Sequence, residues 1–136
     1  MTSRRWVPLG AAFLALWLSG CAGHQVDKAK WAHELEASGF ESVDIDKLAS
    51  VYVNDLCKDD VHELASFLAV SDDAGDLNVD IERLNFRNAC PDRLDDLDKA
   101  VALLPEVQKE AKEACTTPPE DRTEDQALRA EAFGCI

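Results

Sequence analysis

Cysteine is the residue type in this sequence with the most chemistry open to it. The five cysteines are Cys21, Cys57, Cys90, Cys115 and Cys135. No two of them have the Cys-x-x-Cys spacing that thioredoxin-like redox centres and zinc knuckles use. An odd number in an exported chain also leaves one thiol without a partner in the same chain. One of the five thiols therefore needs a separate explanation.

Two histidines begin fragments that look like the start of a zinc-protease helix. "HELEA" begins at His33 and "HELAS" at His62. That helix needs a second histidine four residues after the first, and the positions hold Ala37 and Ser66. Both fragments are better interpreted as solvent-exposed faces of helices.

The fragment "DLNVD" (76–80) resembles the first half of a calcium-binding EF-hand loop. Position 6 of such a loop needs Gly and position 12 needs Glu, whereas the chain has Ile81 and Arg87 there. An acidic helix start explains the fragment better, because carboxylates suit the helix dipole. Hydrolase, phosphate-loop and dinucleotide motifs are also missing from the sequence. We therefore expect no catalytic residue, no metal site and no cofactor.

Aromatic residues and histidines could line a pocket for a small ligand. The candidates are Trp31, Tyr52, Phe67 and Phe86, with His33 or His62 nearby. Their spacing is more typical of a hydrophobic core, and nothing in the sequence selects haem ligation by His or Tyr.

The first twenty residues have the order of segments found in an export signal. Arg4 and Arg5 supply positive charge, an apolar run follows, and Ser19 and Gly20 end it. The run is shorter than the roughly 20 residues of a membrane-spanning helix, which disfavours a short transmembrane anchor. The Ser-Arg-Arg start is similar to a twin-arginine signal, but Pro8 interrupts the continuation, so general secretion is favoured.

The end of this signal resembles the lipobox of bacterial lipoproteins. Leu18-Ser19-Gly20-Cys21 fits that motif at every position. The resemblance implies a diacylglycerol on the Cys21 thiol, cleavage between Gly20 and Cys21, and acylation of the new amine, for example with palmitate. The two or three acyl chains of such a modification would hold the protein firmly to a membrane. We expect a signal peptide (1–20), a lipid-anchored tether (21–25) and an acidic helical domain (26–136), on the outer face of the cell membrane.

Lipidation of Cys21 leaves four cysteines to form two disulfides in the oxidising compartment outside the cytoplasm. Three pairings are possible. We favour Cys57–Cys90 with Cys115–Cys135, because each pair joins neighbouring predicted helices.

The charge of the chain excludes one class of partner. The sequence has 27 acidic and 14 basic residues, a net charge of −13. Removal of Arg4 and Arg5 with the signal leaves 12 basic residues and a net charge near −15. Nucleic acid is therefore not expected as a partner, since phosphates need a basic face. Close contact of the domain with anionic lipid is also disfavoured.

The rest of the chain predicts an all-α fold, a small bundle of five or six short helices. Apolar residues recur at helical spacing and no strand-like alternation occurs. Asp44 is a good N-cap, and Asp60 with Glu63 matches a capping box. Gly39 should end the first helix, with Phe40 folding back on the core. The expected helices cover about 26–38, 44–57, 59–70, 77–90, 92–104 and 121–133. Pro105 is expected either to kink the fifth of these helices or to begin a further segment that ends at Cys115. Leu128 and Phe133 should return the last helix to the body.

The segment from about 31 to 92 resembles a family of small exported helical proteins of mycobacteria and related actinobacteria, whose function is unknown. The similar elements are "WAHELEASGF", "LASVYVNDLC" and "RLNFRNACP", which cover about half of the chain. The resemblance implies an all-α fold and a disulfide between Cys57 and Cys90, and it supplies no activity.

These observations favour a non-enzymatic lipoprotein of the cell envelope that acts through contacts with an unknown protein partner. One alternative is a carrier of haem or a lipid-like molecule in a groove between helices. Another is an exclusion or immunity lipoprotein encoded by a phage or other mobile element.

Overall fold

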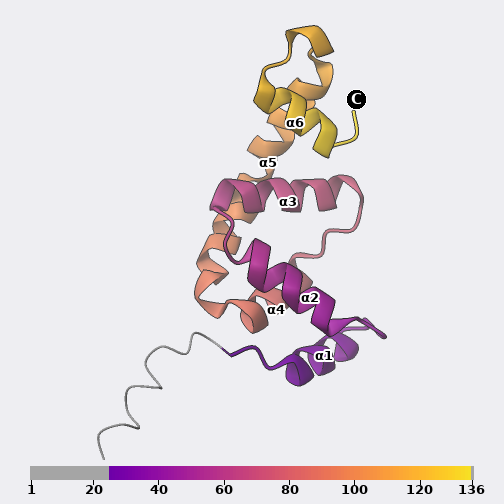
Figure 1. Ribbon diagram of the computed structural model, residues 1–136, viewed down its shortest axis with the longest axis vertical. Helices are drawn as coiled ribbons and strands as arrows, with labels where there is room; N and C mark the ends of the chain where they lie inside the picture. The colour runs from indigo at the N-terminus through magenta and orange to yellow at the C-terminus, as the bar shows by residue number, and fades with distance from the viewer. Residues whose placement is uncertain (1–24, 136) are drawn as a thin grey trace, which may run out of the picture.

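The structure is a computed structural model that describes residues 25–135, and every regular element in this range is a helix (Figure 1). The predicted all-α fold is therefore confirmed. The α-helices are α1 (Lys28–Ala37), α2 (Ile45–Val51), α3 (Val61–Asp73), α4 (Val79–Ala89), α5 (Leu94–Thr116) and α6 (Glu124–Ala132). A π-helical turn, η1 (Tyr52–Leu56), and two 3-10 turns, η2 (Pro91–Arg93) and η3 (Pro119–Asp121), complete the order. Within residues 25–135, no helix is both long and apolar enough to cross a membrane.

Side-chain caps determine where several helices begin. The Asp44 carboxylate accepts a hydrogen bond from a backbone N–H in the first turn of α2. At α3, Asp60 and Glu63 each accept from the backbone N–H of the other, which is the predicted capping box. Thr123 and Gln126 form a second capping box at α6, which the sequence analysis did not identify.

Gly39 ends α1 as predicted. Its φ of 93° lies in the left-handed region that glycine occupies without strain. The next N–H, of Phe40, donates to the carbonyl of Leu35 at 3.0 Å, the bond that closes a Schellman motif. The expectation that Phe40 folds back on the core was wrong, because its side chain is 43% exposed. The backbone closes the helix without burying the ring.

α5 is one continuous helix with Pro105 inside it, so the expectation that a separate segment could begin at Pro105 was wrong. A proline removes a helical N–H and crowds the preceding turn, so helices usually end before it. Here Pro105 is exposed. The buried positions continue on both sides of it, with Leu97 and Ala100 before and Val107 and Ala111 after. Packing of this stripe against α3 and α6 holds α5 together through the proline.

The expected second helix ends in the π-helical turn η1, a feature that the sequence did not indicate. The N–H of Cys57 donates to the carbonyl of Tyr52, five residues earlier, at 2.8 Å. Tyr52 and Leu56 are both buried by this wider turn.

Both favoured disulfides are present. Cys57–Cys90 joins the end of η1 to the end of α4, with Cα atoms 6.0 Å apart. Cys115–Cys135 joins α5 to the segment after α6, with Cα atoms 5.5 Å apart. The first disulfide therefore links helices of the main core, and the second holds α6 against α5.

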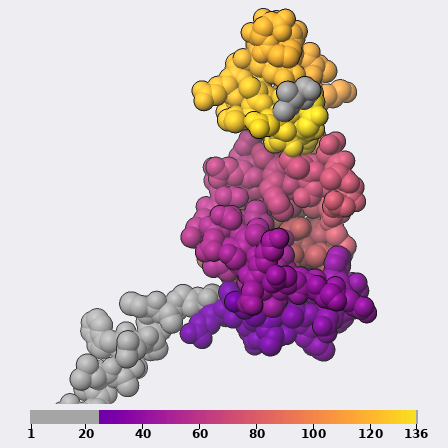
Figure 2. Space-filling model, turned by 45° about the vertical axis from the view of Figure 1, so that its right-hand side comes forward, coloured from indigo at the N-terminus to yellow at the C-terminus, as the bar shows by residue number. Residues whose placement is uncertain are grey.

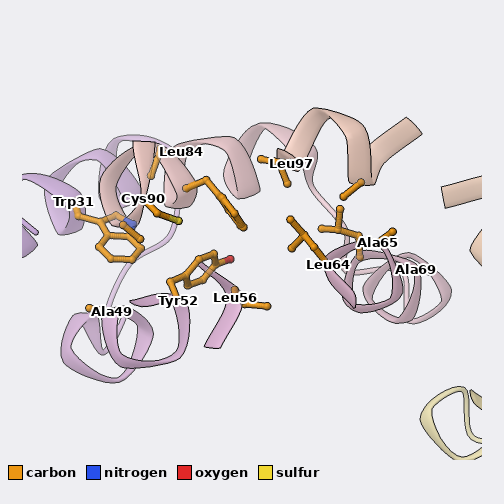
Figure 3. Packing of buried hydrophobic residues seen from close by; sticks show 14 of the residues in the cluster. Trp31, Ala49, Tyr52, Leu56, Leu64, Ala65, Ala69, Leu84, Cys90 and Leu97 are labelled. Carbon is orange, nitrogen blue, oxygen red and sulfur yellow. The ribbon is translucent and has the colours of Figure 1, made fainter. Parts of the chain in front are cut away.

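The molecule has a main core and a smaller C-terminal lobe. The main core lies between α1, α2, η1, α3, α4 and the first part of α5, and Figure 3 shows its side chains in contact. Its largest fully buried side chains are Trp31, Phe86, Leu64, Leu68, Leu97 and Val107. We define the C-terminal lobe as residues 111–135. It packs through the small buried side chains Ala111, Ala114 and Ala130, and in Figure 2 it is set off from the rest by a narrowing.

Candidate functional site

The predicted signal peptide and lipidation site lie outside the described residues. This holds for Gly20 and Cys21, and for all but the last residue of the predicted tether. The cleavage and lipidation expected there stay predictions.

The aromatic candidates are mostly in the core. Trp31, Tyr52 and Phe86 are buried, and the ring of Tyr52 contacts the other two edge to face, with ring centroids 5.8 Å apart in each pair. Figure 3 shows Trp31 and Tyr52 near each other in the core. Their interpretation as core residues is confirmed. His33 is exposed on α1, and the structure gives it no contact with this cluster. Phe67 is half-buried, packs against the edge of the core and also lines hollows on the surface.

A polar network crosses this core, and the sequence analysis missed two of its members. The indole Nε1 of Trp31 donates to Oδ1 of Asn85 at 2.8 Å, and Nδ2 of Asn85 donates to the Tyr52 hydroxyl at 3.0 Å. That hydroxyl donates to Oε2 of Glu82 at 2.5 Å. The network links α1, η1 and α4. Its only sequence signal is that Asn85 and Asn88, three residues apart, interrupt an otherwise apolar face.

Burial raises the pKa of both ionisable groups in this network, Tyr52 and Glu82. Burial raises the pKa of Glu82, and the hydrogen bond from Tyr52 lowers it by less. Burial and the nearby Glu82 carboxylate raise the pKa of Tyr52, so the phenol keeps its proton at neutral pH. A small cleft of about 260 Å³ opens beside them. Asp76 and Glu82 both line this cleft. The hydrogen bonds of Glu82 and Asn85 hold α4 against η1 and α1.

A mainly apolar hollow of about 520 Å³ lies between α3 and α6, and we call it the α3/α6 groove. A neighbouring hollow of about 560 Å³ is lined mostly by polar residues, among them Asp72, Asp73 and Lys112. The apolar lining of the α3/α6 groove is Phe67, Val70, Leu128, Ala132 and Phe133, and its polar lining is His62, Glu63, Ser66, Asp125 and Arg129. In Figures 1 and 2 the α6 segment lies directly above α3.

Leu128, which lines the groove, is more exposed than its place in the apolar pattern of the last helix predicts. It was expected to return α6 to the body, yet its side chain is 59% exposed. α6 packs on α5 through Ala130 and the Cys115–Cys135 disulfide instead. Leu128 is thereby left at the mouth of the groove.

An ionic cluster connects the three helices around the groove. Nε2 of His62 on α3 lies 3.4 Å from Oε2 of Glu110 on α5. The Arg129 guanidinium of α6 pairs with the same carboxylate oxygen. Arg129 is the one Lys or Arg among the lining residues, and Glu110 offsets its charge. Glu63 and Asp125 therefore dominate the charge of the rim.

The apolar surface continues from the groove towards α2. Phe67 also lines a second hollow of about 360 Å³, together with Leu48, Val51 and Leu56. Val51 is 41% exposed. Phe67 therefore joins two apolar hollows on one side of α3.

The structure also places the fragments that resembled metal sites. Asn78 is the N-cap of α4 and accepts from the N–H of Ile81, and Asp80 lies in the first turn. The "DLNVD" fragment is thus a helix start. Across residues 25–135, no group of three or more His, Cys, Asp and Glu side chains is arranged to hold a metal ion.

The comparisons with known proteins supply no further identification. No family model, curated protein or solved structure matches this chain.

Proposed function

We propose that this chain is a lipoprotein of the cell envelope, anchored through lipid on Cys21, whose acidic helical body binds another protein and has no enzymatic activity. The α3/α6 groove is the observation that carries this proposal. It combines apolar lining, an exposed leucine and a polar rim. Apolar patches of this kind on soluble domains are typical of interaction sites.

The anchor is supported by the sequence and is compatible with the disulfides. Leu18-Ser19-Gly20-Cys21 fits a lipobox, and lipidation there explains the odd cysteine. Two disulfides among the remaining cysteines suit an oxidising compartment.

The arrangement of the helices suits an anchored binding protein. α1, which follows the predicted tether, lies at one end of the body, and α6 lies at the other (Figure 1). The seven residues from Cys21 to α1 reach at most about 25 Å. An anchor at Cys21 would therefore hold the α1 end near the membrane and direct the groove away from it.

A protein partner is favoured over a carried ligand. Three of the four aromatic side chains that a haem or lipid carrier would use, Trp31, Tyr52 and Phe86, are packed in the core, and of the four only Phe67 lines the groove. An exclusion or immunity role would be one form of the same binding function, directed at an envelope receptor.

The anchor is tested by fractionation and intact mass of the tagged chain from its own envelope. The mature protein should be in the membrane fraction, begin at Cys21 and carry the mass of the lipid. Cys21→Ala should abolish both the lipid mass and the processing before residue 21. An unmodified N-terminus in the native protein would refute the anchor.

The binding function is tested by comparing proteins that copurify with the native chain and with two variants. Leu128→Glu places a charge in the groove, and Val53→Glu places the same charge at an exposed valine that does not line it. A partner should be lost with Leu128→Glu and kept with Val53→Glu. Haem or lipid recovered with the native protein, in place of a protein partner, would support the carrier instead.

A further inference from the structure

We propose that the α3/α6 groove binds a basic amphipathic helix of the partner, with the apolar face of that helix on Phe67, Val70 and Leu128 and its Lys or Arg side chains beside Glu63 and Asp125. This inference rests on the proposed binding function and specifies the chemistry of the partner.

The shape of the groove suits a helix. α3 and α6 both pack on α5, and the groove lies between them. Its lining covers residues 62–70 of α3 and continues from Asp125 to Phe133 along the α6 segment, and each range corresponds to about 12 Å of helix rise, or two turns. A helix lying there would be the fourth member of a small bundle with α3, α5 and α6. Its side chains at i, i+3 or i+4, and i+7 would contact the apolar lining.

The rim of the groove is acidic. Asp125 has no ion-pair or hydrogen-bond partner for its carboxylate among residues 25–135, and the Glu63 carboxylate accepts only the capping bond from Asp60. The acidic edge continues beyond Glu63. Burial and the adjacent carboxylates of Glu63, Asp55 and Asp60 raise the pKa of Asp59, and the nearby Arg93 guanidinium offsets only part of this effect. A positively charged partner would relieve this repulsion.

The same charges disfavour two other occupants. A second copy of this chain would bring another strongly acidic molecule, with a net charge of −13 for the full sequence, against the rim. An anionic lipid surface would be repelled by the same carboxylates. The apolar lining therefore selects an apolar face, and the rim selects a basic one.

The test uses the full mature chain with Cys21→Ser, secreted so that both disulfides form. The probe is a synthetic 14-residue peptide with Leu at i, i+3, i+4 and i+7 and Lys elsewhere. One control peptide has Glu in place of Lys, and another has the Leu and Lys in scrambled order. Calorimetric titration should give saturable one-to-one binding of the Leu/Lys helix, with the scrambled peptide about tenfold weaker and the Leu/Glu peptide not binding.

Matched variants locate the binding on the protein. Leu128→Gln should lower the affinity for the Leu/Lys helix about tenfold, whereas Val53→Gln should leave this affinity unchanged. Asp125→Asn should lower it about threefold. Asp95→Asn, which removes the same charge in the first turn of α5 and outside the groove, should have a smaller effect.

Three results would overturn the proposal. The ordered and scrambled peptides could bind equally well, or the Leu/Lys helix could fail to bind. The groove variants Leu128→Gln and Asp125→Asn could also have the same effect as their controls Val53→Gln and Asp95→Asn. Concentration-dependent dimerisation that Leu128→Gln abolishes would assign the groove to a second copy. A partner that copurifies in a Leu128-dependent way while the Leu/Lys helix fails to bind would leave the binding function standing and refute only the basic helix.

Discussion

Glu82 is the residue whose environment differs most from what its position in the sequence suggests. It lies in the first turn of α4, where an exposed carboxylate would suit the helix dipole. The structure instead turns it towards the Tyr52 hydroxyl, at a distance of 2.5 Å. Its carboxylate is part of the contact between α4 and η1.

Glu82 should make the stability of the protein depend on pH. Burial raises its pKa in the folded state above the ordinary value of 4.5. The folded protein then binds the proton more tightly than the unfolded chain, so the free energy of unfolding falls as pH rises above 4.5 through the folded-state pKa. Glu82→Gln removes the group that titrates, so this fall in the free energy of unfolding should not occur. The glutamine amide keeps an oxygen that can accept the hydrogen bond from the Tyr52 hydroxyl. The stability of Glu82→Gln relative to the native protein should therefore increase between about pH 4 and pH 7.

Urea denaturation at the two pH values measures this difference. Glu41→Gln is the matched control, because Glu41 is exposed and outside the network. Its stability relative to the native protein should not follow the same trend. A pH-independent difference for Glu82→Gln would show that the buried carboxyl does not carry the effect.

At the residue scale, the sequence predicts burial better than it predicts partners. Helical spacing was sufficient to assign Trp31, Tyr52 and Phe86 to the core. It could not reveal the bonds of Glu82 and Asn85, because their partners come from other helices. The spacing of apolar residues within one helix does not determine which side chain of another helix will face it.

At the scale of elements, the sequence predicted helix ends best where a capping side chain or a glycine determines them. Asp44 and Asp60 cap α2 and α3, and Gly39 ends α1, as their side chains and backbone freedom predict. Local sequence signals failed at Pro105 and at the π-helical turn η1. Both depend on packing: α5 continues because its buried stripe contacts two other helices, and η1 widens where Tyr52 and Leu56 are both buried.

Pro105 lowers the stability of α5 although the helix continues through it, so Pro105→Ala should stabilise the protein. The substitution restores a backbone N–H and removes the crowding of the preceding turn, and the exposed site has room for alanine. The free energy of unfolding should rise by about 1–3 kcal/mol, measured by urea denaturation. Ala102→Gly, at an exposed position in the same helix, should lower it by about 1 kcal/mol. Loss of stability in Pro105→Ala would mean that the proline fits α5 without cost.

At the scale of the whole molecule, the C-terminal lobe depends on its disulfide. Its own core is formed by small alanine side chains, which bury little apolar area. Cys115–Cys135 closes a separation of 20 residues, which contributes about 3 kcal/mol in the chain-entropy model. Replacing both cysteines by serine should therefore release α6 while the main core stays folded.

Amide hydrogen exchange distinguishes this outcome from global destabilisation. In Cys115→Ser/Cys135→Ser, the amides of α6 should lose protection and those of α3 and α4 should keep it. Cys57→Ser/Cys90→Ser is the matched comparison and should reduce protection in the main core. Retained protection in α6 of the first variant would show that the lobe packs independently of its disulfide.

The α3/α6 groove could not be predicted from the sequence, although the fold class and both disulfides were. Leu128 follows helical spacing and was assigned a place against the body. Its exposure arises because α6 is held on α5 by Ala130 and by the disulfide, at a distance from α3 that leaves the groove open. The proposed binding surface therefore comes from the arrangement of three helices, and no single helix encodes it.

Site-specific photo-crosslinking in the native envelope tests directly whether this surface binds a protein. A benzophenone amino acid replaces Leu128 in one version of the full chain and Val53, which is exposed at 36% and outside the groove, in another. We predict one discrete protein adduct from position 128 that is absent from position 53 and is lost when Cys21→Ala removes the anchor. The same adducts from both positions, or no protein adduct from position 128, would contradict the assignment of the groove as the binding surface.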